Sequence, residues 1–328
     1  MALTASFGRP EASDAEVEAA AQSVAAHDFV AQLRGATWTS SRSGAGRSRG
    51  YWVSTDEIRA HRGGLVALLP SHPSDRTARR RTASLDVPVI DRDLIEQVPP
   101  PASCLVLVAH PDDDCFGCSG TAAKWAAGGT AVDLVVATDG SKGSHDITVA
   151  AAEVAARRER EQRASAEVLG YRGVHFLGYP DGELVACEEA VRAVVELIRQ
   201  LRPEIVIGHD PWRLYQLHPD HRAVGEIVRD AVWRAGEPRF YETPSWKPAE
   251  LWLFHAEEPN HVEDVSEWMG AKWEALTRHE SQFSSAFRFD ENDSDGQAQF
   301  KQWFTRRFAL VGQAAGFAYG EAFRRIFV

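Results

Sequence analysis

From residue 103 onward, the chain alternates between short apolar runs and longer amphipathic stretches. Unbroken apolar runs are typical of strands buried on both faces of a parallel sheet, whereas an apolar position every three or four residues indicates a helix. Strands are predicted over 104–109, 131–138, 174–177 and 204–208, and helices over 117–127, 149–169, 187–201 and 220–234. This order predicts an α/β fold with a Rossmann-like, doubly wound, mainly parallel sheet, whose functional residues lie at the carboxyl ends of its strands.

The first 102 residues follow a different pattern, and we interpret 1–102 as an N-terminal accessory segment beside a main domain over 103–328. Ser13 and Glu16 have the spacing of a helix capping box, which predicts a helix over 13–33. Residues 39–48 are mostly Ser, Gly and Arg and have the composition of a mobile loop. Apolar stretches at 65–69 and 87–90 would favour aggregation if exposed. We therefore expect the segment to pack on the main domain and line its cleft.

Composition and charge exclude several classes of function. Apolar residues make up 44% of the 328 residues and charged residues 25%, as in a globular protein with a substantial core. The net charge of −11 argues against nucleic-acid binding, which needs a surplus of Lys and Arg. No apolar run approaches the roughly 20 residues of a membrane span, and the first residues lack the basic start and apolar core of a secretory signal. The expected location is therefore the cytoplasm, without membrane partners, and the sequence is compatible with a homo-oligomer.

A dense acidic cluster directly follows the first predicted strand, where residues 109–114 read Ala-His-Pro-Asp-Asp-Asp. Three consecutive carboxylates repel one another unless a positive charge lies between them. A divalent metal ion would supply that charge, and a turn would let His110 and Asp113 face the same ion. The alternative interpretation is an Asp-rich start of a helix without a metal.

A second cluster, Leu-His-Pro-Asp-His at 217–221, follows the strand predicted over 204–208 and begins a helix. A single His-x-x-His spacing is weak support for a metal site, because surface histidines recur at this spacing by chance. Two such clusters at one edge of a sheet are stronger support. They offer two imidazoles and a carboxylate and leave a fourth position for water, which is the open arrangement of a catalytic zinc site.

Further motifs along the chain extend this pattern. They are Gly-Cys-Ser-Gly-Thr at 117–121, Thr-Asp-Gly at 138–140, Gly-Tyr-Pro-Asp-Gly at 178–182, His-Glu-Ser-Gln at 279–282 and Glu-Ala-Phe-Arg at 321–324. Together with the two His/Asp clusters, they resemble the PIG-L/LmbE-like family of zinc-dependent N-acetylglucosaminyl deacetylases. The resemblance covers 103–328 and implies an LmbE-like catalytic domain there.

The resemblance also implies roles for the residues of the two clusters. It implies one zinc ion per chain, held by His110, Asp113 and His221. Asp112 would be the general base that takes a proton from the attacking water. His218, as an imidazolium ion, would stabilise the oxyanion and assist departure of the amine. Asp220 would be a third catalytic residue, raising the pKa of His218 by its negative charge.

Four positions are predicted to contact the substrate: Arg158, Asp181, Ser141 and Gln216. Arg158 would bind a sugar hydroxyl or phosphate, with an ion pair to Glu161 as the alternative. Asp181 would accept a hydrogen bond from a sugar hydroxyl, with a simple turn residue as the alternative. Ser141 and Gln216 depart from the family pattern at substrate-facing positions, and Asp114 replaces the usual Glu.

The function that follows from the resemblance is an amide hydrolase that removes an acetyl group from an N-acetylated amino sugar. The small-molecule substrate is expected to be a glycoside in small-molecule or natural-product biosynthesis. Ser141 and Gln216 keep a second interpretation open, namely an amidase with the same zinc chemistry for a non-sugar amide or a thiol conjugate. A binding protein without turnover is disfavoured, because it needs neither Asp112 nor His218. A nucleotide-binding oxidoreductase is disfavoured, because the first strand lacks a following Gly-x-Gly-x-x-Gly.

Overall fold

The computed structural model describes residues 2–5, 37–43, 46–52, 97–290 and 292–328. The chain divides into two compact units, Met1–Thr82 and Ala83–Val328. The larger unit contains both His/Asp clusters. In the part of the chain that is described, no helix combines the length and the apolar character needed to cross a bilayer.

The larger unit is built on a seven-stranded sheet with the order β6-β5-β4-β7-β8-β10-β9. Neighbouring strands from β6 to β8 run parallel, and β10 pairs antiparallel with both β8 and β9. The strands are β4 (Ser103–Val108), β5 (Ala131–Thr138), β6 (Gly173–Tyr179), β7 (Ile205–His209), β8 (Glu250–Phe254), β9 (His261–Asp264) and β10 (Gly320–Phe327). The mainly parallel α/β sheet predicted from the sequence is confirmed.

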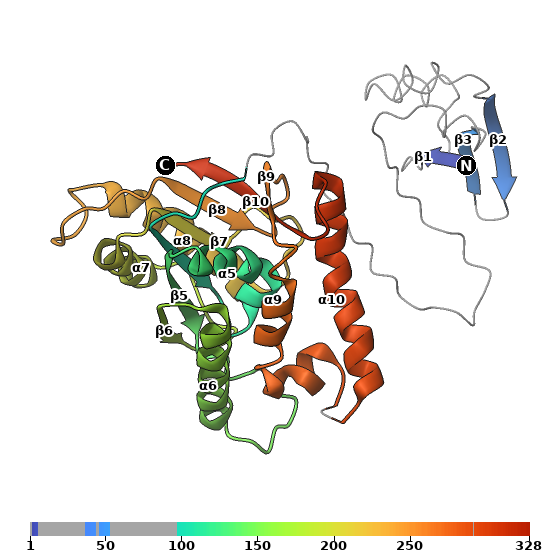
Figure 1. The fold of residues 1–328 in the computed structure, drawn as a ribbon. Coiled ribbons are helices and arrows are strands. Elements are labelled where there is room, and N and C mark those ends of the chain that lie inside the picture. The colour runs from blue at the N-terminus through green and yellow to red at the C-terminus, as the bar shows by residue number, and fades with distance from the viewer. Residues whose placement is uncertain (1, 6–36, 44–45, 53–96, 291) are drawn as a thin grey trace. The chain divides into compact units, whose positions relative to one another are not determined.

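Helices cover both faces of this sheet (Figure 1). They are α4 (Asp113–Gly117), α5 (Ser119–Ala127), α6 (Ala151–Leu169), α7 (Glu188–Leu201), α8 (Pro219–Gly236), α9 (Met269–Leu276) and α10 (Ser294–Ala315). Side chains of β4 alternate between the two faces, as the pleat of a strand requires. Leu105 and Leu107 pack in the core under α7 and α8, while Val106 and Val108 pack with Trp125 of α5. The unbroken apolar run of β4 is therefore explained by burial on both sides.

The antiparallel extension of the sheet was missed from the sequence. β8 and β10 are paired through residues more than 60 positions apart, such as Phe254 with Phe323. Along β10, buried, half-buried and exposed residues are mixed, so it shows neither a continuous apolar run nor strict alternation. The helix predicted over 117–127 is confirmed as α5, and the structure adds α4 before it, which starts at the acidic turn and is separated from α5 by a break at Cys118.

The smaller unit contains a three-stranded antiparallel sheet with the order β1-β3-β2. Its strands are β1 (Ala2–Ala5), β2 (Thr37–Ser43) and β3 (Gly46–Trp52). The prediction of a loop over 39–48 is therefore wrong, because most of these residues lie in paired strands. Thr and aromatic residues favour strands, and Trp38 and Tyr51 are partners in the β2–β3 register. The predicted helix over 13–33 and the apolar stretches 65–69 and 87–90 lie outside the described residues.

Residues 97–102 belong to the larger unit, although the sequence placed them in the accessory segment. Gln97 Nε2 donates to Val262 O at 2.9 Å, and Ala102 N donates to Glu204 Oε2 at 2.8 Å. The packing of the accessory segment on the cleft stays a prediction.

Candidate metal centre and catalytic site

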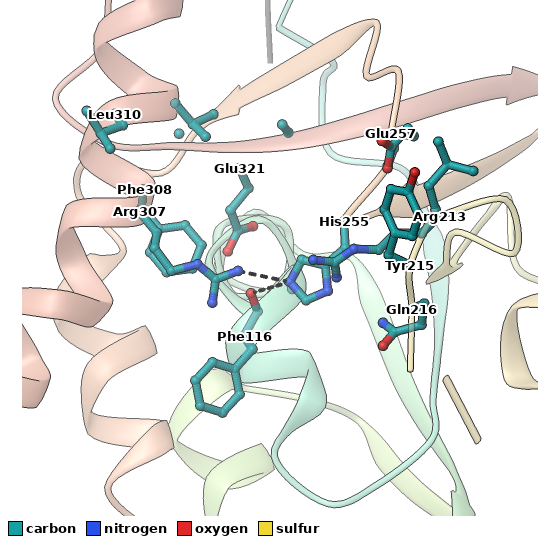
Figure 2. Close-up of a pocket in the computed structure, with 16 residues that line it drawn as sticks. Phe116, Arg213, Tyr215, Gln216, His255, Glu257, Arg307, Phe308, Leu310 and Glu321 are labelled. Carbon is teal, nitrogen blue, oxygen red and sulfur yellow. Dashed lines mark hydrogen bonds between the residues drawn. The ribbon is translucent and has the colours of Figure 1, made fainter. Parts of the chain in front are cut away.

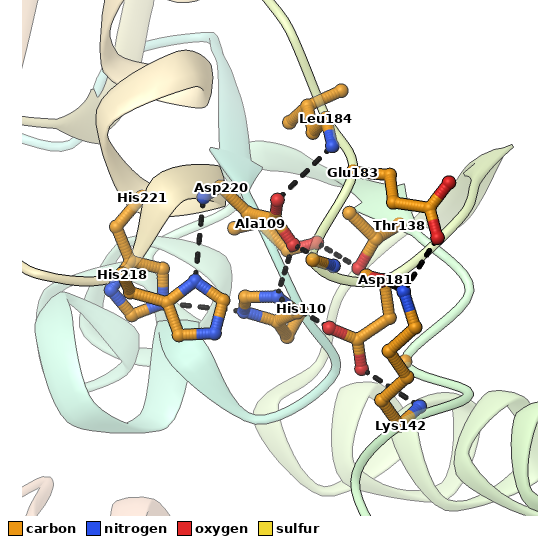
Figure 3. A network of polar contacts seen from close by, with 12 residues as sticks. Ala109, His110, Thr138, Lys142, Asp181, Glu183, Leu184, His218, Asp220 and His221 are labelled. Atoms are coloured by element: carbon orange, nitrogen blue, oxygen red, sulfur yellow. Dashed lines mark hydrogen bonds and ion pairs between the residues drawn. The ribbon is translucent and has the colours of Figure 1, made fainter.

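The two His/Asp clusters meet at the carboxyl edge of the parallel strands (Figure 3). His110 follows β4, and His218 and His221 lie at the start of α8, after the loop that leaves β7. β4 and β7 are neighbours in the sheet, so residues about 110 positions apart in sequence become adjacent. Both clusters therefore lie at the carboxyl ends of parallel strands, as the predicted fold requires.

Local turn geometry fixes both clusters. Asp112 has a φ of 96°, in the left-handed region that a non-glycine residue rarely occupies, and α4 begins at the next residue. Asp113 accepts a hydrogen bond from the backbone of His110 at 2.8 Å, which closes the turn. In the second cluster, Pro219 occupies the first turn of α8, where its missing N–H costs nothing.

The predicted metal ligands converge. His110 Nδ1 lies 3.4 Å from Asp113 Oδ2 and 3.2 Å from His221 Nε2. His221 Nε2 lies 3.2 Å from Asp113 Oδ1. Tetrahedral ligands at about 2.1 Å from zinc are separated from one another by about 3.4 Å. The three side chains therefore lie at ligand-like distances from one another, although Asp113 uses a different oxygen toward each histidine. With one donor atom from each residue, the groups that could share an ion include His110 with His218 and His221.

His209, at the end of β7, is a residue of this site that the sequence analysis missed. Its side chain is buried, and its Nε2 lies 3.4 Å from Asp113 Oδ2 without a hydrogen-bond partner among the described residues. Asp113, His209 and His221 form one of the groups whose donor atoms lie close enough to share an ion. Burial lowers the pKa of His209 to about 4, so its imidazole is neutral, the form that binds metals. Its position directly after the strand predicted over 204–208 was the available signal.

His110 is surrounded by carboxylates. Its Nε2 lies 2.9 Å from Asp220 Oδ2 and 3.4 Å from Asp181 Oδ1. Burial opposes protonation of His110, but hydrogen bonds to Asp113, Asp181 and Asp220 outweigh it and raise its pKa to about 11. Burial would likewise raise the pKa of Asp113, yet the neighbouring imidazoles, His221 foremost, hold it well below its usual range. This concentration of negative charge favours a cation at the centre of the cluster.

Asp220 raises the pKa of His218, as predicted, but other groups outweigh this effect. Asp220 is fully buried, and its carboxylate accepts from His110 and from the backbone N–H groups of Gly182 and Leu184. Burial, with the nearby His110 and His221, lowers the pKa of His218, and the opposing effect of Asp220 is smaller. His218 therefore favours the neutral form. Its Nδ1 accepts from the backbone N–H of Asp220 at 3.3 Å, which leaves the proton on Nε2.

Asp112 is held by Arg158 from α6. Arg158 Nη2 lies 3.3 Å from Asp112 Oδ2 and donates to Pro111 O at 2.6 Å. Burial raises the pKa of Asp112 to about 7, although the charge of Arg158 opposes this shift. The alternative pairing of Arg158 with Glu161 is wrong, because Glu161 pairs with Arg157 and accepts from Ser281.

The other predicted substrate contacts surround the same cluster. Asp181 faces His110, and its Oδ2 accepts from the backbone N–H of Lys142 at 3.0 Å. Ser141 is half-buried in the loop after β5 and donates its N–H to Asp139 Oδ1. Gln216 Oε1 accepts from the backbone N–H of His218 at 3.3 Å. Their contacts with a substrate stay predictions, as does that of Arg158, whose guanidinium is buried.

Comparison with known proteins supplies the family. The family model described as PIG-L, GlcNAc-PI de-N-acetylase, matches residues 105–232. A diacetylchitobiose deacetylase from Thermococcus kodakarensis is 34% identical over 229 residues, covering 67% of this chain and 81% of that protein. A 1D-myo-inositol 2-acetamido-2-deoxy-alpha-D-glucopyranoside deacetylase from Nocardiopsis dassonvillei is 30% identical over 173 residues, covering 45% of this chain and 61% of that protein.

A solved structure agrees with these matches. The N,N'-diacetylchitobiose deacetylase from Pyrococcus horikoshii, in complex with its inhibitor MPG, is similar with a TM-score of 0.64 and 29% identity. The similarity covers 70% of this chain and 87% of that chain. These relatives are deacetylases of substrates that contain N-acetylglucosamine. The chain belongs to the PIG-L/LmbE-like family of N-acetylglucosaminyl deacetylases.

Proposed function

We propose that this protein is a metal-dependent amide hydrolase that removes the acetyl group from an N-acetylated amino sugar. The observation that carries the proposal is the convergence of His110, Asp113 and His221 within 3.2–3.4 Å of one another, with Asp112 and His218 beside them. Membership in a deacetylase family supports the same reaction.

The donor set fits a divalent ion such as zinc, held by His110, Asp113 and His221, with one ion per chain. A bound zinc ion lowers the pKa of a water molecule and polarises a carbonyl oxygen. Asp112 would accept the proton of the attacking water as its oxygen bonds to the acetyl carbon, and would return it to the nitrogen as the C–N bond breaks. The Nε2–H of His218 would donate to the developing oxyanion. The products are acetate and a free amine.

Metal content tests the ligand assignment. We expect the purified protein to hold about one divalent ion per chain, and His110→Ala, Asp113→Ala and His221→Ala to lose it, because each removes one of three ligands. Elemental analysis after gel filtration gives the ratio of metal to protein, and circular dichroism confirms that each variant is folded. Full retention of metal in all three variants would refute the ligand set.

Acetate release tests the reaction. The metal-loaded protein is incubated with N,N'-diacetylchitobiose and N-acetylglucosamine, and acetate and primary amine are measured together, because hydrolysis yields one of each. A non-sugar N-acetyl amide serves as the comparison substrate, because Ser141 and Gln216 stand where the family pattern differs. Faster hydrolysis of the non-sugar amide than of either sugar substrate would favour the amidase interpretation.

A further inference from the structure

Asp220 is a charged residue of the site that the proposed reaction does not use directly. Its side chain is fully buried. It does not line the cavity of about 480 Å³ that opens beside the site, between the loop after β7 and helix α10 (Figure 2). Gln216, which accepts from the backbone N–H of His218, does line that cavity. Asp220 is therefore shielded from a ligand in the cavity, and its effect on the reaction has to pass through a neighbouring side chain.

Three hydrogen bonds fix the position of the Asp220 carboxylate (Figure 3). Its Oδ1 accepts from Leu184 N at 3.1 Å, and its Oδ2 accepts from Gly182 N at 2.6 Å. The third bond joins Oδ2 to His110 Nε2, at 2.9 Å. The two backbone donors belong to the loop after β6, whereas Asp220 itself lies in the first turn of α8. The carboxylate is thus held between two elements and directed at His110.

The nearby His218 does not share a hydrogen bond with this carboxylate. The hydrogen bond that joins the two residues runs from the backbone N–H of Asp220 to His218 Nδ1, at 3.3 Å (Figure 3). Both carboxylate oxygens are instead occupied by the loop after β6 and by His110. Asp220 therefore acts most directly on His110.

The bond to Asp220 determines which nitrogen of His110 faces the other proposed ligands. A neutral imidazole carries one proton, and an ionised carboxylate can only accept, so the bond keeps this proton on Nε2. The lone pair is then on Nδ1, the atom that lies 3.2 Å from His221 Nε2 and 3.4 Å from Asp113 Oδ2. Asp181 Oδ1 is a more distant partner of Nε2, at 3.4 Å. A carboxylate behind an imidazole in this way fixes the orientation of the ring and makes it a stronger metal ligand.

A direct ligand role for Asp220 is the alternative. His110, Asp181, His218 and Asp220 form a second group whose donor atoms lie close enough to share an ion. In that group His110 would turn Nε2 to the ion, and its 2.9 Å contact with Asp220 would no longer be a hydrogen bond. Both oxygens of Asp220 already accept from backbone N–H groups, which compete with a cation for their lone pairs. These bonds favour a positioning role over a ligand role.

We propose that Asp220 is a positioning residue of the metal site, which holds the His110 imidazole with Nδ1 toward Asp113 and His221 and thereby strengthens metal binding. This inference rests on the proposed metal-dependent function. It moves the main role of Asp220 from the acid–base chemistry of His218 to the metal site.

The zinc affinity of Asp220 variants tests this role without turnover. The dissociation constant for zinc is measured by competition with a chromogenic chelator, and circular dichroism confirms that each variant is folded. We expect Asp220→Ala to weaken zinc binding by about 10- to 100-fold, because His110 loses its acceptor. Asp220→Asn keeps one acceptor oxygen and should retain part of the affinity. Glu226→Gln removes an exposed carboxylate from the same helix and should leave the affinity unchanged.

The ring proton of His110 gives a second readout that a loss of stability alone would not change. Zinc-loaded protein with ¹⁵N-labelled histidine should show a slowly exchanging Nε2–H signal in the NMR spectrum, identified by its absence from His110→Gln. We expect this signal to broaden or disappear in Asp220→Ala, because the proton then lacks its buried acceptor, and to persist in Glu226→Gln.

The outcomes separate this inference from the proposed function. Unchanged zinc affinity and an unchanged Nε2–H signal in Asp220→Ala would overturn the proposal, and a lowered kcat in that variant would then assign Asp220 to His218. Complete loss of zinc in both Asp220 variants would make Asp220 a ligand and would also overturn it. If the wild type bound zinc but released no acetate, the proposed deacetylation would be wrong, whereas the titrations would still decide the role of Asp220.

Discussion

Lys272 and Glu321 form an ion pair whose side chains are both fully buried, with 2.5 Å between Nζ and Oε1. The same carboxylate accepts from Gly120 N, Thr121 N and Thr121 Oγ1 at 2.6–2.9 Å. The pair therefore connects α9 and β10 to the first turn of α5. Lys272→Met keeps most of the apolar stem and removes the charge, so it leaves the Glu321 carboxylate buried without a cation.

Removing one partner of a buried ion pair typically costs about 3–5 kcal/mol, because the remaining charge stays desolvated. Three hydrogen bonds to Glu321 remain, and they place the expected loss at the lower end of that range, about 3 kcal/mol. For a domain of this size, about 2–4 °C of Tm corresponds to each kcal/mol. We therefore expect Lys272→Met to lower Tm by about 6–12 °C.

Thermal unfolding followed by circular dichroism measures this shift, with urea unfolding as a second measure of the free energy. Arg278→Met is the matched control, because it breaks an exposed pair with Glu274 and should cost less than about 1 kcal/mol. Adding Glu321→Gln to Lys272→Met should cost less than the sum of the two single changes, since both act on one pair. A Tm for Lys272→Met equal to that of the control would refute the reasoning.

Four further substitutions test the catalytic site and the packing of α8. Asp112→Ala and His218→Ala should keep the metal and lower kcat by roughly 10²–10⁴-fold, and near-normal turnover in either variant would contradict its role. His209→Ala should weaken metal affinity by about 10- to 100-fold, because it removes the imidazole that faces the Asp113 carboxylate. A competition titration with a chelator measures this affinity. Unchanged affinity would mean that His209 contributes only to packing. Gly225→Ala places a Cβ 2.9 Å from the backbone of Pro211, so α8 has to shift. We expect this change to lower the free energy of unfolding, measured in urea, by about 1–3 kcal/mol. Unchanged stability would mean that the loop containing Pro211 moves away without cost.

The sequence by itself determined the elements of the parallel sheet and the chemistry at its edge. Apolar runs such as the one in β4 are local signals, since burial on two faces constrains every residue of the strand. The residues that follow β4 and begin α8 could also be found, because the carboxyl ends of parallel strands lie together. His110, Asp113 and His221 were predicted as one group from this rule and from the family resemblance, and their donor atoms do converge.

Only the tertiary structure decided which partner each charged group takes. Asp220 is two residues from His218, yet its carboxylate pairs with His110, because the helix start turns it toward β4. The buried pair of Lys272 with Glu321 joins residues 49 positions apart. These pairings depend on strand order and helix packing, which local periodicity does not specify. A local sequence pattern indicates whether a residue faces the core or the solvent. The residue that it contacts on that face belongs to a chain segment far away in the sequence, so the pattern cannot identify it.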